Sequence, residues 1–184
     1  TNAGAVTITD LTPGTATATA TSLDVTAGGV ITVAAMNQVG SMGLSTTSGN
    51  VVIGSVGDVD ATSVTASTDA GNITATDVAD ATSVTLNANG DGDANAAAAD
   101  GDVTVTDASA ATSMSITASG GISIASSDLV RDMSLTAGQA YTLANVNDVM
   151  SLTVITSAKP SRAKGRGPCA RLPIAQHQAR LRGV

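Results

Sequence analysis

The sequence repeats a unit of about twenty residues, and each unit contains two short segments in which apolar and hydroxyl side chains alternate. The first segment begins with an apolar or aromatic residue, at Val6, Ile31, Val51, Ile73, Val103, Ile122 and Tyr141. The second segment carries two apolar residues two positions apart, at Leu23/Val25, Met42/Leu44, Val64/Ala66, Val84/Leu86, Met114/Ile116, Met133/Leu135 and Leu152/Val154. A small or branched apolar residue lies three positions before each of these pairs, at Ala20, Val39, Ala61, Ala81, Ala111, Val130 and Val149. A fixed internal period is typical of folds that stack one structural unit on the next.

The alternation predicts that both segments of each unit are β-strands, with branched side chains inward and hydroxyls outward. Pairs such as Gly49-Asn50 and Gly71-Asn72 precede first strands and supply the positive φ angles that sharp corners need. A single strand pair cannot bury its own apolar face, whereas stacked pairs form a continuous core. We therefore expect an all-β fold, a parallel β-solenoid (β-helix) of about seven coils of 19–22 residues with two main strands per coil. Such a rod would be on the order of 34 Å long.

A β-sandwich or barrel of short strands is the alternative architecture. Neither fold requires equivalent positions to recur at intervals of 19 to 22 residues, which favours the solenoid. Trp and Phe are absent and Tyr141 is the only aromatic residue, so aliphatic side chains must fill the interior. Because rings carry much of the buried area of wide cores, their absence indicates a narrow one. Outward-facing Thr residues should form ladders on the two faces, at Thr7, Thr9, Thr32, Thr74, Thr76, Thr104 and Thr106 and at Thr26, Thr65, Thr85, Thr117, Thr136 and Thr153.

Charge divides the chain into residues 1–156 and residues 157–184. The first part contains all 15 acidic residues and only one basic residue, Arg131, whereas the second contains the other seven Lys and Arg. We expect residues 1–156 to form the β-solenoid repeat domain, and residues 157–184 to be a basic, Pro-containing tail that is disordered or foreign sequence. A tail that folds against the acidic rod or a partner is the other interpretation. An acidic body disfavours nucleic acid and anionic lipid, and the chain has no apolar run near the ~20 residues of a membrane span.

About ten extra residues separate Leu86 from Val103, and this insertion, which should protrude as a loop, is rich in oxygen ligands. The ligand set resembles a calcium-binding loop and comprises Asn89, Asp91, Asp93, Asn95, Asp100 and Asp102. Two features depart from that loop, because Ala96 stands where Gly makes the sharp turn and Asp102 stands where a bidentate Glu is usual. The insertion is therefore predicted to be either a calcium site or a solvated polar loop.

Residues that could support catalysis are scarce. The only His, His177, lies in the tail, so residues 1–156 cannot form a nucleophile–His pair or a His-rich metal site. Paired Asp residues could serve sugar cleavage, but only Arg131 and Tyr141 could then help to hold a sugar. We expect a non-enzymatic protein without an organic cofactor. The only Cys, Cys169, also lies in the tail, which suits an extracellular setting, and without a starting Met or signal peptide we expect a mature or excised segment.

Two stretches carry a resemblance to a known family: GNITATDVADATSVTLNA, beginning at Gly71, and GDVTVTDASAATSMSITASGGISIASSDLVRDMSLTAG, beginning at Gly101. They resemble the repeats of filamentous-haemagglutinin-like bacterial adhesins, and the resemblance extends over residues 1–156. It implies a right-handed parallel β-helix that serves as a stiff stalk on a bacterial surface or in a biofilm matrix, with cell-surface or matrix components as partners. The amino-terminal secretion domain of that family has no counterpart here.

Both ends of the repeat domain read as mid-repeat, without an amphipathic helix or charged cap over the terminal strands. Uncovered strand edges pair readily with other chains. We therefore expect end-to-end self-association or a longer parent protein. A second functional hypothesis is an ice-binding β-solenoid, because TATATATS at residues 15–22 and the outward Thr rows resemble the Thr-x-Thr arrays of such proteins. Ser, Gly, Ala and Asn interrupt the rows.

Overall fold

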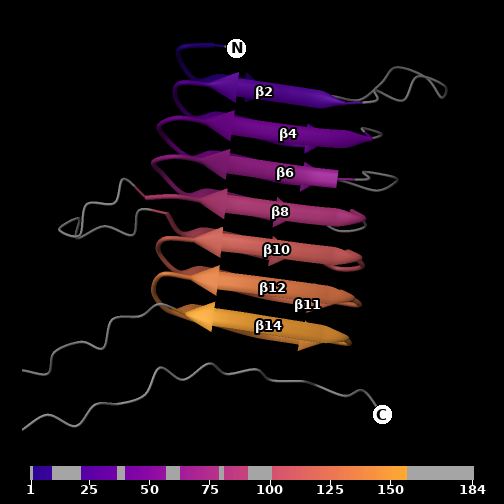
Figure 1. Ribbon diagram of the computed structural model, residues 1–184. Helices are drawn as coiled ribbons and strands as arrows, with labels where there is room; N and C mark the ends of the chain where they lie inside the picture. The colour runs from indigo at the N-terminus through magenta and orange to yellow at the C-terminus, as the bar shows by residue number, and fades with distance from the viewer. Residues whose placement is uncertain are drawn as a thin grey trace, which may run out of the picture.

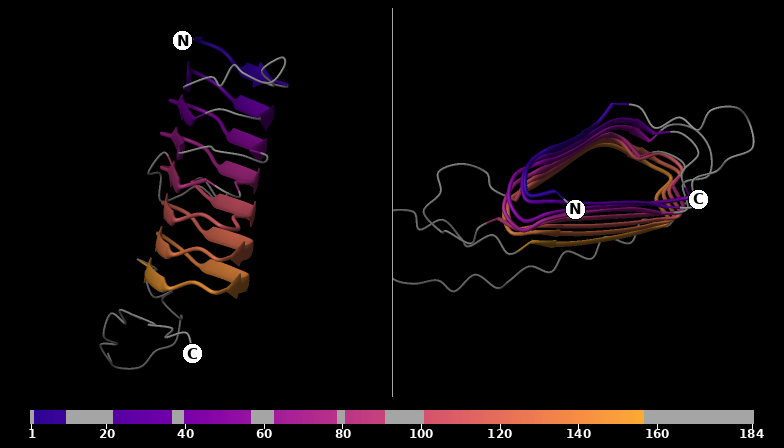
Figure 2. Two further views of the ribbon diagram at one scale, coloured as in Figure 1. Left: turned by 90° about the vertical axis from the view of Figure 1, so that its right-hand side faces the viewer. Right: turned by 90° about the horizontal axis from the view of Figure 1, so that it is seen from above.

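Two seven-stranded parallel sheets face one another across a thin core (Figures 1 and 2). The computed structural model describes residues 2–9, 22–36, 40–56, 63–78, 81–90 and 101–156. The odd sheet contains β1 (Val6–Ile8), β3 (Ile31–Met36), β5 (Val51–Val56), β7 (Ile73–Asp77), β9 (Val103–Asp107), β11 (Ile122–Asp128) and β13 (Tyr141–Asn147). The even sheet contains β2 (Leu23–Ala27), β4 (Ser41–Thr46), β6 (Ser63–Thr68), β8 (Ser83–Ala88), β10 (Ser113–Ala118), β12 (Asp132–Ala137) and β14 (Ser151–Thr156).

The chain alternates between the two sheets, so that each strand pairs in parallel with the strand two places along the sequence. This is the predicted parallel β-solenoid. Seven strands per sheet span about six turns, slightly fewer than the seven coils expected from the seven strand pairs. Six steps at about 4.8 Å give a stack roughly 29 Å long. In Figure 1 the chain runs leftwards along the even strands, returns rightwards behind them and descends from the N-terminus, so the coil is right-handed.

The strand positions expected from the repeat are confirmed. Every predicted starting residue of a first segment is the first residue of an odd strand. The apolar pairs of the second segments point inward, and direct pairing of neighbouring strands places Val64, Val84 and Met114 in one column. The same column continues to both ends of the stack, through Leu23, Met42, Met133 and Leu152. In-register pairing thus converts the sequence period into stacks of like side chains.

The core is narrow and aliphatic, as the composition predicted. Inward residues of the interior coils are almost fully buried, with exposed fractions of 0–3% for residues such as Ile53, Val84 and Leu135. The third apolar column closes the core between the two sheets, since Ala81, Ala111, Val130 and Val149 are all buried. Its earlier members, Ala20, Val39 and Ala61, lie outside the described residues. Tyr141, the only Phe, Tyr or Trp residue of the chain, is 41% exposed, so the core formed by the described residues is aliphatic.

Glycines turn the chain at the corner before the odd strands. Gly49 and Gly101 have φ angles of 103° and 86°, in the region that L side chains rarely adopt. The Thr residues expected on the outside point outward on both sheets, and most of them are exposed. Residues 157–184, the predicted tail, lie outside the described part of the chain. Within the described part, no helix has the length and apolar character needed to cross a membrane.

Ser127 is a polar residue whose side chain is fully buried in the apolar core. Ser127, near the end of β11, occupies the position that Val78 and Ala108 occupy in neighbouring coils, and it is 0% exposed. Its hydroxyl has no hydrogen-bond partner in the described structure. A buried hydroxyl without a partner costs roughly 1–3 kcal/mol, because it loses its hydrogen bonds to water on folding.

We therefore expect Ser127→Ala to raise the free energy of unfolding by about 1 kcal/mol. Thermal or chemical denaturation followed by circular dichroism measures this change. Ser126→Ala is the matched control, because Ser126 is the preceding residue but is partly exposed, and its substitution should change stability by less than about 0.5 kcal/mol. A destabilised Ser127→Ala variant would show that the hydroxyl has a partner in solution.

Candidate functional site

Side-chain oxygens form a ladder along the corner that precedes the odd strands. Asn50, Asn72 and Asp102 lie directly before β5, β7 and β9. The Asn50 Oδ1 accepts a hydrogen bond from the Asn72 backbone N–H at 2.9 Å, and the Asn72 Oδ1 accepts one from the Asp102 N–H at 2.8 Å. The Asp102 Oδ1 in turn accepts from the Gly121 N–H. The ladder ends there, because Gly121 has no side chain to continue it.

The ladder satisfies backbone groups that the strand pairing does not reach. At a corner the chain changes direction, and a backbone donor left without a partner is costly. Asn and Asp side chains are short enough to supply that acceptor from the preceding coil. The sequence analysis identified Gly49-Asn50 and Gly71-Asn72 only as turn residues. The recurrence of Asn or Asp after a corner Gly was the available signal for the ladder.

The predicted calcium ligands divide between described and undescribed residues. Asn89 is exposed just after β8, and its backbone N–H donates to the Thr68 carbonyl oxygen at 2.9 Å. Asp102 lies before β9 with one carboxylate oxygen engaged in the ladder. The other four, Asp91, Asp93, Asn95 and Asp100, lie outside the described residues, so the calcium site stays a prediction. Among the described residues, no group of three His, Cys, Asp or Glu side chains could hold a metal ion.

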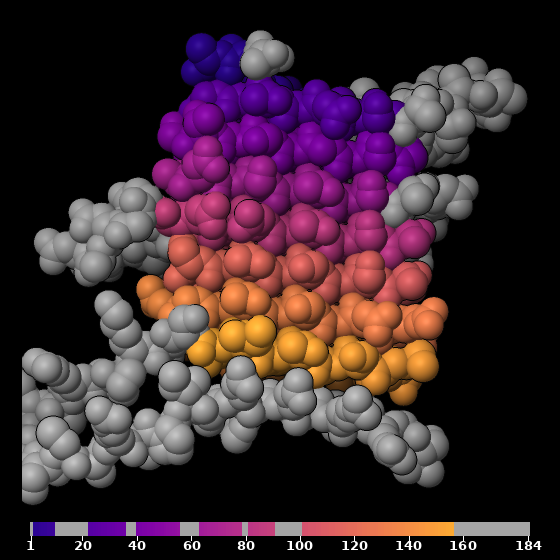
Figure 3. All heavy atoms as spheres, in the orientation of Figure 1, coloured from indigo at the N-terminus to yellow at the C-terminus, as the bar shows by residue number. Residues whose placement is uncertain are grey.

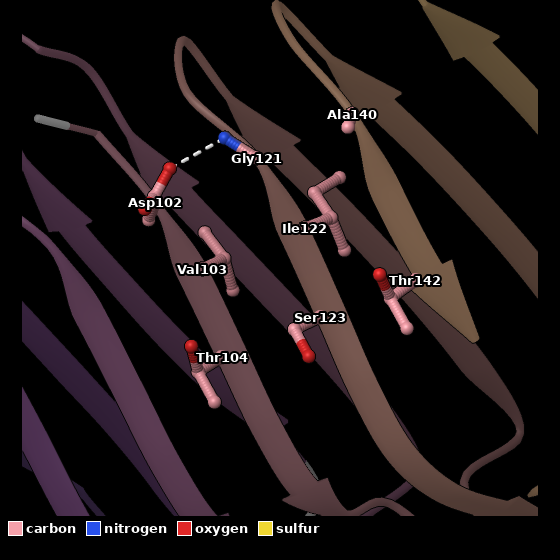
Figure 4. Close-up of a pocket in the computed structure, with 8 residues that line it drawn as sticks. All are labelled: Asp102, Val103, Thr104, Gly121, Ile122, Ser123, Ala140 and Thr142. Atoms are coloured by element: carbon pink, nitrogen blue, oxygen red, sulfur yellow. Dashed lines mark hydrogen bonds between the residues drawn. The ribbon is translucent and has the colours of Figure 1, made fainter. Parts of the chain in front are cut away.

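A shallow hollow opens on the odd sheet where the ladder ends (Figure 4). Its volume is about 190 Å³, and it is lined by Asp102, Val103, Thr104, Gly121, Ile122, Ser123, Ala140 and Thr142. The hollow borders Gly121 and Ala140, whose side chains are minimal. This volume is below the roughly 300–1,000 Å³ of typical ligand pockets. The hollow can offer one carboxylate and several hydroxyls to a polar surface, but it does not have the size of an enclosed ligand site.

The outer face of the even sheet is the most regular polar surface of the described structure, and we call it the hydroxyl face (Figure 3). Strand pairing arranges its outward side chains in three columns. The first contains Ser41, Ser63, Ser83, Ser113, Asp132 and Ser151. The central column contains Asp24, Gly43, Thr65, Thr85, Ser115, Ser134 and Thr153. The third contains Thr26, Ser45, Ser67, Asn87, Thr117, Thr136 and Ile155.

The hydroxyl face is flat as well as regular. Viewed along the solenoid axis, the even strands follow one nearly straight side of the coil, whereas the chain bends on the opposite side (Figure 2). From Thr65 onward the central column is an unbroken run of five hydroxyl residues. Neighbouring hydroxyls also bond along a column, as the Ser67 Oγ donates to the Ser45 Oγ at 3.3 Å. Five residues without a hydroxyl interrupt the pattern: Asp24, Gly43, Asn87, Asp132 and Ile155.

Two acidic residues near the turn between odd and even strands, Asp107 and Asp132, make local contacts within the fold. The Asp107 Oδ1 accepts hydrogen bonds from the Ser109 N–H at 3.1 Å and the Ser109 Oγ at 2.6 Å, as a turn-capping residue does. Asp77 pairs directly with Asp107 in the neighbouring coil. Asp132 lies 3.8 Å from the Arg131 Nε in an exposed ion pair. Such an exposed pair contributes at most about 1 kcal/mol.

Comparison with known proteins found no matching family model, no matching curated protein and no matching solved structure. The stacked parallel coils implied by the resemblance to filamentous-haemagglutinin-like repeats are present. Membership of that family stays a prediction.

The ladder predicts different results for two substitutions. Asn72→Ala removes the acceptor of the Asp102 N–H and should lower the free energy of unfolding by about 1 kcal/mol. Asp102→Asn keeps an acceptor oxygen for the Gly121 N–H, so its effect in the presence of a chelator should be within about 0.5 kcal/mol. Chemical denaturation with and without calcium measures both. If calcium stabilises the wild type and Asp102→Asn abolishes that gain, Asp102 is also a calcium ligand; equal effects of the two substitutions would contradict the ladder.

Proposed function

We propose that this chain is a rigid structural or adhesive segment, a stalk or fibre element of a bacterial surface or biofilm-matrix protein outside the cell. The observation that carries the proposal is the unbroken in-register pairing of seven strands in each sheet over one continuous core. Every interior strand is hydrogen-bonded on both sides, so the stack resists bending and local opening. A solenoid of this kind presents long, regular outer faces, which suits contact with extended surfaces.

The hydroxyl face is our candidate adhesive surface. Its Ser and Thr side chains both donate and accept hydrogen bonds, which suits hydroxyl-rich matrix polymers such as polysaccharides. The described side chains that could hold a sugar for cleavage are few, and Arg131 is engaged with Asp132 in the ion pair. We therefore propose binding without catalysis and without a resident organic cofactor. The resemblance to adhesin repeats and the Cys-free body support the extracellular setting.

Retention of coated beads under flow tests the adhesive proposal. Beads that carry isolated, covalently attached copies should be held on bacterial biofilm matrix, and free protein should compete. Thr85→Lys/Ser115→Lys places two long charged side chains in the central column of the hydroxyl face, and it should reduce retention to the level of uncoated beads. The matched control is Thr104→Lys/Ser123→Lys, which makes the same change on adjacent strands of the odd sheet. Wild-type beads that wash off like uncoated ones would contradict the proposal.

Ice binding is the second candidate function, and the flat hydroxyl face is the observation that favours it. Hydroxyls repeat at about 4.8 Å from coil to coil and about 6.6–6.8 Å along each strand, so the face is a two-dimensional lattice. A crystalline surface such as ice is a suitable partner for a lattice of this kind. Wild-type protein would then show thermal hysteresis near freezing that Thr85→Lys/Ser115→Lys abolishes and Thr104→Lys/Ser123→Lys leaves unchanged. Absence of hysteresis at millimolar protein removes this candidate.

A further inference from the structure

We propose that copies of this chain stack head to tail, with the last coil of one copy (β13 and β14) pairing with the first coil of the next (β1 and β2). The partner is therefore a second copy of the same chain. The inference deepens the proposed structural role and rests on it, because it supplies the means by which a short rod extends into a fibre.

The two end coils leave apolar core residues partly open. Interior members of the inward columns are 0–3% exposed, as at Met42, Val64 and Ile124. The partly buried apolar residues that pack against this core all belong to the terminal strands, at Val6, Ile8, Leu23, Val25, Leu143, Val146, Leu152 and Val154. Larger apolar groups are exposed on the last coil as well: Tyr141 at 41%, Met150 at 72% and Ile155 at 49%. A further coil at each end would bury this surface.

The backbone at both ends is also incompletely paired. β1 and β2 end their sheets at one extreme of the stack, and β13 and β14 end them at the other, so among the described residues each has one neighbouring strand. Asn2 pairs with Ala27, and its N–H donates to the Thr26 carbonyl oxygen, whereas no described residue pairs with Leu23–Val25 on that side of β2. Edge strands present unpaired N–H and C=O groups and readily add another strand.

A second copy fits these edges because the contact between two copies would repeat the contact that successive coils already make within one chain. Continuing the two sheets in register would place Leu23 against Leu152 and Val25 against Val154. It would place Ile8 against Leu143 in the odd sheet. Strand direction and inward side-chain size match those of the internal contacts, such as Met133 against Leu152. The last coil of one copy and the first coil of the next would therefore pair as two successive coils of a single solenoid do.

The geometry of this contact points to open fibres. The surface of one end binds the opposite end of the next copy, so the contact is heterologous and leaves a free end after every addition. Ring closure would require a strong bend between copies, whereas the internal stack is straight (Figure 1). Each chain carries a formal charge of −7, so like copies repel, and salt should strengthen the association by screening that repulsion.

Lysine substitutions at the two ends test the proposal. Val154→Lys places a charge in the inward column of the last coil, and Val25→Lys does the same in the first. Sedimentation velocity and electron microscopy should show concentration-dependent fibres for the wild type and monomers for each variant alone. An equimolar mixture of the two variants should give dimers and nothing longer, since one intact end remains on each. The matched controls are Thr153→Lys and Thr26→Lys, adjacent outward positions that should still form fibres.

Other outcomes would overturn the inference. A wild type that stays monomeric at millimolar concentration and high salt contradicts stacking. Dimers of Val25→Lys alone would show that two last coils meet each other, and failure of the mixture to dimerise would exclude head-to-tail pairing. Circular dichroism verifies that each variant is folded, and Leu143→Lys is a second disruption of the last coil if Val154→Lys unfolds. Adhesion of isolated copies on beads is independent of stacking, so either proposal can fail without the other.

Discussion

Hydrogen bonding between successive coils, in parallel and in register, is the constraint on which the rest of this structure depends. It fixes the rise of the chain per turn at the strand spacing of about 4.8 Å. It also places each residue directly over its counterpart one coil away, as Thr65 lies over Thr85 and Ser115. Once that register exists, apolar positions become core columns, hydroxyl positions become outer columns, and corner Asn and Asp residues become a ladder. All three are consequences of one pairing rule applied along the chain.

The same rule explains why a core without rings suffices. An inward side chain is enclosed above and below by its equivalents and across the coil by the opposite sheet, so that Val, Leu and Met fill the available width. Val84 at 1% and Leu135 at 0% exposure show how complete this enclosure is in the interior. Among the described residues, the inward apolar side chains that are only partly buried lie on the terminal strands, where one neighbouring coil is missing. The close packing of the interior coils and the partial exposure of the terminal coils therefore have a common origin.

Much of this architecture could be predicted from residue spacing, because in-register stacking requires similar residues to recur at a regular interval along the sequence. The starts of the odd strands and the inward pairs of the even strands followed from the recurrence of residues such as Ile73 and Val103. The ladder of Asn50, Asn72 and Asp102 did not follow, since its bonds depend on the path of the backbone through the corner and not on alternation. For Ser127, the period-two pattern gave no warning, because the alternation within β11 shifts by one residue at Ala125 and Ser126, neither of which is buried, before Ser127 faces inward. A binding target would leave no such periodic signal, and four of the predicted calcium ligands, Asp91, Asp93, Asn95 and Asp100, lie outside the described residues.

The insertion between β8 and β9 shows how tolerant a stacked coil is of added sequence. The ten residues from 91 to 100 enter at a corner, yet Ser83 still pairs with Ser113 and Thr74 with Thr104 across the interrupted turn. The pairing of the strands on either side sets the register. A longer corner segment therefore leaves the columns of stacked side chains intact. A chain built in this way can gain or lose residues at its corners while the strand pairing along its axis stays unchanged.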